Sequence, residues 1–131
     1  WQANVALALE QTFGPWLVNA TAIVAKRTER FGQTLGTQIS FLAAGAYTFG
    51  NDAALALSGT YVLEGDANDT TGARVPFSSR HLTTFTLSFL FPFLDNWRLL
   101  GGVFVEPPLS GLGTNQPSAS GLTLTVIHSW L

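Results

Sequence analysis

Apolar and polar residues alternate along several segments of the chain, which is the period of a β-strand. The alternation is clearest over 81–93, where every second residue of the central part is apolar and the residues between them are mostly Thr and Ser. Successive side chains of a strand point to opposite faces of a sheet, so this segment predicts a strand with one apolar and one largely polar face. The apolar positions are Phe85, Leu87, Phe89, Phe91 and Phe93, and the others are Thr84, Thr86, Ser88 and Leu90.

Similar patterns recur along the chain, and apolar residues at the helical period of 3.6 do not persist in any of these segments. We predict strands at 1–13, 16–26, 36–49, 53–64, 81–93, 97–106 and 121–131. Each has about 10–14 residues, whereas strands of soluble proteins commonly have about 5–6. A tilted membrane-spanning strand needs about 9–11 residues, so the lengths favour a membrane protein.

The segments between these strands alternate in length. Short connectors at 14–15, 50–52 and 94–96 alternate with long ones at 27–35, 65–80 and 107–120. Tight turns on one side and long loops on the other are typical of transmembrane β-barrels. The fold class that we predict is therefore all-β, an antiparallel up-and-down transmembrane β-barrel, with residues 1–131 forming a single domain or the C-terminal portion of one.

The composition supports this interpretation and excludes other classes. Only 11% of the residues are charged, against about 25% in a typical soluble domain. The mean hydropathy is +0.28, yet no apolar run is long enough for a transmembrane helix. The net charge is −2, with no basic cluster beyond Lys26, Arg27 and Arg30, so we expect no nucleic-acid partner. The absence of cysteine excludes disulfides and thiolate metal sites.

Aromatic residues gather around the short connectors. Amphipathic rings prefer the headgroup region of a bilayer, so we interpret them as an aromatic girdle at one membrane boundary. The alternative is that they cap the core of a soluble barrel. The girdle residues are Phe13, Trp16, Tyr47, Phe49, Phe91, Phe93, Trp97 and Trp130.

Charged residues inside the predicted strands are the candidates for a functional lumen. A charge that faces lipid at the bilayer midplane costs about 2–4 kcal/mol, and strand parity places these residues on the opposite face. They could line a selectivity zone, or they could be solvated structural residues near strand ends. The lumen-facing candidates are Glu10, Glu64, Arg98 and Glu106. Leu90, Leu100 and Phe104 fall on the same face, which indicates a packed lumen or an apolar solute.

The chain resembles bacterial outer-membrane β-barrel proteins over nearly all of its length. Residues 35–49 and 53–61 also resemble strand pairs of the transporter family named for the MetA pathway of phenol degradation. That resemblance implies uptake of small, often aromatic, molecules across the outer membrane. The last strand resembles the signal that the barrel-insertion machinery reads, through Leu122, Leu124, Val126 and Trp130. His128 interrupts the pattern, and the chain ends one residue past the final aromatic.

The resemblance also predicts an orientation, and it raises a problem with the number of strands. Short turns of bacterial barrels face the periplasm, which would place the C-terminal Leu131 there and the long loops outside. Single-chain bacterial barrels normally have an even number of strands, and seven strands violate that rule. We therefore expect an unrecognised strand, missing upstream strands or other chains to complete the barrel. The lack of methionine and of a signal peptide favours missing upstream sequence.

Catalytic motifs are absent from the sequence, so we predict neither an enzyme nor a cofactor. The two histidines, His81 and His128, should lie far apart along the membrane normal, which argues against a shared metal site. Residues 65–70 are rich in oxygen ligands, as calcium loops are, but they lack the spacing and the distal glutamate of an EF-hand. We therefore predict no metal site.

Three functions remain open. The first is a pore or transporter in the bacterial outer membrane for small, possibly apolar or aromatic, solutes, with the lipid bilayer and the insertion machinery as partners. The second is a structural or anchoring subunit of a larger membrane complex. The third is a soluble ligand-binding β-barrel, which strand length, the charge deficit and the one-ended girdle disfavour.

Overall fold

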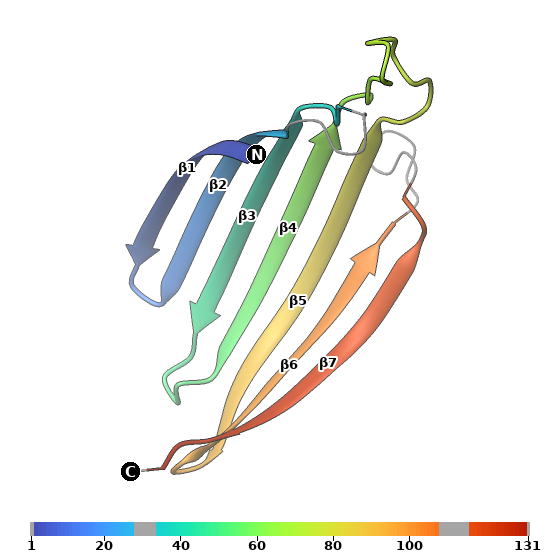
Figure 1. Ribbon diagram of the computed structural model, residues 1–131. Coiled ribbons are helices and arrows are strands. Elements are labelled where there is room, and N and C mark those ends of the chain that lie inside the picture. Colours follow the sequence, from blue (N-terminus) through green and yellow to red (C-terminus); the bar gives the residue numbers. More distant parts are fainter. Residues whose placement is uncertain (1, 28–33, 108–115, 131) are drawn as a thin grey trace.

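The computed structural model describes residues 2–27, 34–107 and 116–130, which form seven β-strands in one antiparallel sheet. The strands lie in chain order, so each described strand is hydrogen-bonded to its neighbours in sequence (Figure 1). They are β1 (Gln2–Phe13), β2 (Trp16–Arg27), β3 (Gln38–Thr48), β4 (Ala54–Glu64), β5 (Arg80–Leu94), β6 (Trp97–Glu106) and β7 (Ala119–His128).

This up-and-down arrangement of seven strands confirms the sequence prediction, but the sheet is not closed into a barrel. Strand β1 pairs with β2 and β7 pairs with β6, and within the described residues their outer edges pair with nothing. Figure 1 shows β1 and β7 at opposite sides of a twisted sheet. The loop predictions for 28–33 and 108–115, and the position of Leu131, lie outside the described residues.

Tight turns join the strands at one end of the sheet, which we call the short-turn end. Gly14 has a φ of 55° and is followed by Pro15, whose ring fixes φ near −65°, so Phe13 and Trp16 are directly paired. The amide of Thr48 donates to the carbonyl of Pro15 at 2.9 Å, which ties this turn to the end of β3. A two-residue turn likewise connects β5 and β6. The opposite end carries the longer connections and is called the long-loop end (Figure 1).

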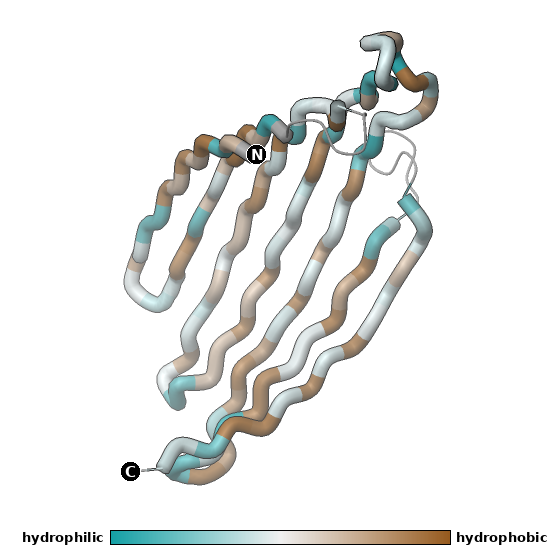
Figure 2. Tube along the Cα trace, viewed as in Figure 1, coloured by the Kyte–Doolittle hydropathy of each residue, from teal (hydrophilic) through white to brown (hydrophobic). Residues whose placement is uncertain are grey.

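The pairing register divides the sheet into two chemically distinct faces. Residues directly opposite one another in an antiparallel pair share a face, and residues alternate between faces along a strand. Leu57 is opposite Gly45 and Leu87, whereas Ser58 is opposite Ala44. The predicted alternation is therefore confirmed across strands, and Figure 2 shows it as alternating brown and pale segments.

We call the two surfaces the apolar face and the polar face. Large side chains of the apolar face include Val5, Leu7, Leu9, Val24, Phe41, Leu57, Phe85, Leu87, Phe89, Val103, Leu122 and Leu124. Side chains of the polar face include Glu10, Asn19, Ser58, Thr60, Thr84, Thr86, Ser88, Thr123 and Thr125, interspersed with Ala and Leu.

The described part of the chain has no packed core. Ala25 is its one buried hydrophobic residue and Thr83 its one buried polar residue. Val5, Leu57 and Leu122, from three regions of the apolar face, are 77%, 60% and 74% exposed. A soluble domain buries one face of such a sheet against a second layer, so this single layer needs another environment or another element against its apolar face.

A bulge interrupts the alternation near the end of β5. Pro92 is opposite Arg98 and Leu94 is opposite Trp97, which leaves Phe93 as the extra residue. Proline has no N–H to give to the ladder, and bulges are among the few places where sheets tolerate it. Phe93 therefore has no direct partner on β6, although its ring centroid lies 6.3 Å from that of Trp97.

Two glycines in the C-terminal strands lie beneath aromatic rings. A Cβ at Gly101 would overlap the tip of the Phe89 ring, and one at Gly121 would overlap the ring of Phe104. Each ring belongs to the residue directly opposite its glycine on the neighbouring strand. Aromatic rings covering cross-strand glycines fill the space where a side chain is missing and help to fix the register.

Candidate functional site

The polar face is the candidate functional surface, because it gathers the charged strand residues that the sequence singles out. Glu10, Glu64, Arg98 and Glu106 all lie on it by register. They are spread from one end of the sheet to the other and do not form a cluster. The arrangement is suited to lining a surface along which a solute passes, and it lacks the convergence of a catalytic site.

Glu10 lies near the short-turn end of β1, directly opposite Asn19 of β2. The Oδ1 atom of Asn19 is buried and has no hydrogen-bond partner among the described residues. Asn19 in turn is opposite Ala44, and that residue is opposite Ser58. The Glu10 carboxylate is exposed and can accept hydrogen bonds from a polar solute or from water.

Two acidic residues mark the long-loop end of the polar face. Glu64 ends β4 and lies directly opposite Arg80, the first residue of β5. Glu106 ends β6, and its Oε1 accepts a hydrogen bond from the Thr84 hydroxyl at 3.3 Å. Sequence analysis missed Arg80, although it and Glu64 flank the same long connection. Glu64 and Glu106, both predicted from the sequence, therefore belong to a polar rim at the long-loop end.

Arg98 lies at the other end of β6, opposite Pro92 and beside the bulge. The register thus separates Arg98 from Glu106 along β6, as predicted from sequence. Leu90 and Leu100 are directly opposite one another between these regions, and Phe104 lies against Gly121. These apolar side chains of the polar face thus pack between neighbouring strands, while Leu100 stays 40% exposed.

A glutamine that sequence analysis did not identify holds the last long connection to β5. The side-chain amide of Gln116 accepts a hydrogen bond from the Thr83 N–H at 2.7 Å and donates one to the Thr83 carbonyl at 2.8 Å. The paired register of β6 begins only at Phe85, so the amide occupies the place of the next strand residue. Thr83 is 3% exposed as a result. A lone Gln in a loop gives no sequence signal for such a contact.

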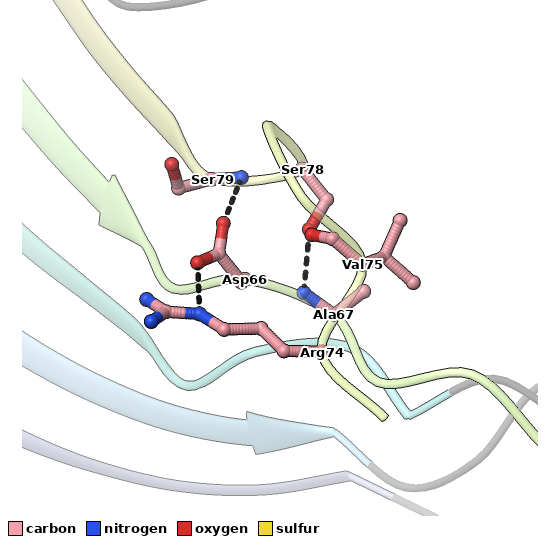
Figure 3. A network of polar contacts seen from close by, with 6 residues as sticks. All are labelled: Asp66, Ala67, Arg74, Val75, Ser78 and Ser79. Carbon is pink, nitrogen blue, oxygen red and sulfur yellow. Dashed lines mark hydrogen bonds and ion pairs between the residues drawn. The ribbon is translucent and has the colours of Figure 1, made fainter. Parts of the chain in front are cut away.

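The connection over 65–79 is built around Asp66. One carboxylate oxygen accepts the Ser79 N–H at 2.9 Å and the other forms an ion pair with the Arg74 guanidinium (Figure 3). The Ser78 hydroxyl accepts the Ala67 N–H at 2.8 Å. Partial desolvation opposes ionisation of Asp66, but the Ser79 amide and the Arg74 charge outweigh it and lower the pKa of this carboxyl.

Asp69 organises the tip of the same connection. Its Oδ1 accepts the Thr71 hydroxyl at 2.6 Å, the Thr71 N–H at 2.8 Å and the Ala73 N–H at 2.9 Å. The Thr71 hydroxyl bond is the main cause of the lowered pKa of Asp69, with the backbone bonds adding to it. The oxygens of Asp66 and Asp69 are therefore directed at donors of the protein itself. This geometry accounts for the oxygen-rich sequence over 65–70 without a calcium ion.

The aromatic residues that were predicted to form a girdle lie at the short-turn end, most of them in two groups of neighbouring rings. Trp16 and Tyr47 have centroids 4.9 Å apart, as do Tyr47 and Phe49. In the second group, Phe93 and Trp97 are 6.3 Å apart. Two other predicted residues also lie in this region, Phe13 opposite Trp16 and Phe91 opposite Leu99.

His128 completes the second aromatic group, a role that sequence analysis did not predict. Its ring lies 4.4 Å from that of Trp97 and 4.3 Å from that of Trp130. His81 is instead near the start of β5, where its ring is 6.3 Å from that of Tyr61. The prediction that the histidines lie at opposite ends of the sheet is confirmed. Across the described ranges, no three His, Cys, Asp or Glu side chains are placed to hold a metal ion.

The apolar face is hollowed by a groove. A groove of about 430 Å³ follows small residues on β2, β3 and β4, among them Ala20, Ala43 and Gly59. Leu9 borders it on one side and Phe85 on the other. Its lining is almost entirely apolar, so it offers no polar recognition.

The described residues contain no helix that is long and apolar enough to cross a membrane.

Comparisons with protein-family models, with curated proteins and with solved structures found no match for this chain. Its function is therefore inferred from its own residues.

Proposed function

We propose that this chain forms part of the wall of a bacterial outer-membrane β-barrel that passes small solutes. The observation that carries the proposal is the division of a single-layer sheet into an exposed apolar face and a polar face. In a barrel wall the first would meet lipid and the second the lumen.

The apolar face fits a lipid environment because it continues across all the described strands. Val5 and Leu7 lie on β1, and Leu122 and Leu124 lie on β7, with large exposed apolar residues on the strands between. Exposed apolar patches on soluble monomers rarely exceed a few hundred Å² and usually mark an interaction surface. A hydrocarbon phase would cover the whole face at once, whereas a protein partner would have to match it over seven strands.

The polar face fits a lumen because it combines hydroxyl groups, small residues and a few charges. Glu10 supplies a charged acceptor near the short-turn end of β1, and Glu106 and Arg80 supply charges near the long-loop end. Leu90, Leu100 and Phe104 add apolar surface among them. This mixture favours small solutes, including apolar or aromatic ones, over large charged molecules.

The aromatic groups at the short-turn end support an orientation with that end, and the C-terminus, in the periplasm. Trp97 and Trp130 then lie at the headgroup level, and the long connections face outward. The alternating apolar residues of β7 are consistent with recognition by the barrel-insertion machinery. Lipid and that machinery are thus the proposed partners.

Conductance of the assembled protein in planar bilayers tests the proposal. We expect discrete channels, and we expect Glu10→Gln to reduce the preference for cations over anions. Asp69→Asn is the control, because that carboxylate lies in the connection over 65–79, outside the strands that would form the wall. A protein that stays monodisperse in buffer without detergent would refute the membrane proposal and favour a soluble ligand-binding barrel.

A second candidate function is a structural or anchoring subunit of a larger membrane complex. The observation that favours it is the open sheet, since both outer strands need partners. Assembled protein that inserts in bilayers without conductance, and whose lumen is plugged, would support this role over transport.

A further inference from the structure

The outer edges of β1 and β7 carry backbone N–H and C=O groups that have no strand partner among the described residues. Hydrogen-bonded and non-bonded pairs alternate across an antiparallel ladder, so every second residue of an edge strand points its N–H and C=O outward. In a bilayer these groups have no water to bond with, so an open edge is strongly unfavourable. If the chain is a barrel wall, as proposed above, both edges must be covered.

Neither edge carries the features that protect a naturally free strand. Exposed edges are usually short, or bear Lys, Pro or bulges. Strand β1 has 12 residues with no Lys, Arg or Pro, and β7 has 10 with none of the three. Both keep an unbroken register with their inner neighbours. Regular edges of this length, in which Glu10 is the one Asp, Glu, Lys or Arg residue, are suited to strand addition.

The topology fixes the direction of the strands that can be added. Six successive antiparallel pairings make β1 and β7 run the same way, from the long-loop end to the short-turn end. An antiparallel partner of either strand must therefore run from the short-turn end to the long-loop end. An odd number of added strands is then needed to connect the two edges by antiparallel pairs.

A second copy of these seven strands does not meet this requirement. Two copies inserted the same way up in a membrane can meet only through their edge strands, β1 or β7. Because β1 and β7 run in the same direction, the two strands at such a junction would also run in the same direction. Such junctions could only be parallel, which is the less stable pairing per residue.

We propose that each edge binds an antiparallel strand from outside these seven, running toward the long-loop end and part of an odd-numbered set. The alternation of β1 specifies its side chains. It carries apolar residues level with Val5, Leu7 and Leu9, and small or polar residues level with Ala6 and Ala8, so that both faces of the sheet continue.

Disulfide mapping in detergent tests the direction, because the chain contains no cysteine. The probe is a twelve-residue peptide of alternating Val and Thr, with one cysteine at either end. Asn4→Cys marks the long-loop end of β1 and Thr12→Cys its short-turn end. These positions are about 26 Å apart at about 3.3 Å per residue, and a disulfide needs Cα atoms within about 7 Å, so the two directions are distinguishable.

We expect the peptide with a C-terminal cysteine to cross-link to Asn4→Cys and to lose cross-linking at Thr12→Cys. The N-terminal cysteine should give the reverse. Thr60→Cys, on β4 between two paired neighbours, is the control that should not cross-link. Ala119→Cys, at the long-loop end of β7, and Ile127→Cys, at its short-turn end, provide the same test if the β1 variants fold poorly.

The opposite pattern, or no cross-linking by variants whose circular dichroism shows intact β-structure, would overturn the inference. Copies that cross-link to one another through Asn4→Cys and Ala119→Cys without peptide would also overturn it. The assay needs no conductance, so its outcome is separate from that of the proposed pore function.

Discussion

Leu57 and Ser58 are neighbours in β4, yet they belong to surfaces with opposite requirements. Leu57 lies on the apolar face with Leu87 opposite it, and Ser58 lies on the polar face among small residues. The two residues share a strand and lie at nearly the same depth along it. Any difference in how they tolerate a substitution therefore comes from the face that each occupies. The environment of a residue in this sheet is therefore set by the face to which its side chain points, because the described residues form no packed core.

The largest expected effect comes from placing a charge on each face in turn. In bilayers, Leu57→Arg should destabilise the folded protein by about 2–4 kcal/mol, because the charge would face hydrocarbon. Ser58→Arg, its matched control, should change stability by no more than about 0.5 kcal/mol. Denaturant titration of the protein in phospholipid vesicles measures both. Equal losses would remove the distinction between the faces.

A second expected effect is shared by the two faces, because it depends on rings that cover glycines. Gly101→Ala on the apolar face and Gly121→Ala on the polar face should each cost about 1–3 kcal/mol, since a methyl would displace the ring of Phe89 or Phe104. Gly45→Ala is the control, because its Cβ would meet only Val18 Cγ1, at 3.9 Å. Equilibrium unfolding checks the series. A loss at Gly45 as large as at the other two would contradict this explanation.

A smaller and local effect is expected at the long-loop end, where the side-chain amide of Gln116 pairs with the backbone of Thr83 in place of a β6 residue. Gln116→Ala removes both hydrogen bonds to Thr83, each worth about 0.5–1.5 kcal/mol, so local opening should become easier by about 1–2 kcal/mol. Hydrogen exchange of the Thr83 amide measures this. Gln116→Glu keeps the acceptor but loses the donor, so it should retain only part of the protection. Unchanged exchange in Gln116→Ala would show that the amide does not hold this segment.

The smallest effect concerns pH and is confined to the connection over 65–79. The folded-state pKa values of Asp66 and Asp69 are lowered below the unfolded value of about 3.9. Their stabilising contribution is therefore fully present above that pH and is lost as pH falls through the lowered values. Amide shifts of Ser79 and Ala73 should move in that acidic range while those of the strands stay constant. A transition between pH 5 and 7, or none at all, would be inconsistent with these hydrogen bonds.

Much of the fold could be predicted from the sequence because alternation and turn chemistry are local signals. Gly14-Pro15 and Asp95-Asn96 fixed two hairpins, and the alternation over 54–64 gave β4 its faces. Strand ends were less accurate beside long connections. Strand β7 begins at Ala119, where the prediction placed 121, because propensity alone does not show where pairing with Glu106 stops.

The candidate surface was only partly predictable for a related reason. The alternation of side chains between the two faces can be read within a single strand. It therefore placed four charged residues on one face, namely Glu10, Glu64, Arg98 and Glu106. Gln116 bound to Thr83, and His128 between Trp97 and Trp130, depend on pairing between distant segments. The bulge at Phe93 was signalled only by Pro92, and a proline does not say which residue becomes the extra one.

Site-directed spin labelling at Leu57 and Ser58 tests whether the apolar face meets lipid and the polar face meets water. A cysteine at either position would be the sole one in the chain. The protein is reconstituted in phospholipid vesicles, and relaxation by oxygen, which dissolves in hydrocarbon, is compared with relaxation by a water-soluble nickel complex. We predict that oxygen relaxes the Leu57→Cys label preferentially and that nickel relaxes the Ser58→Cys label preferentially. Equal access of the nickel complex to both labels would contradict the assignment of the apolar face to lipid.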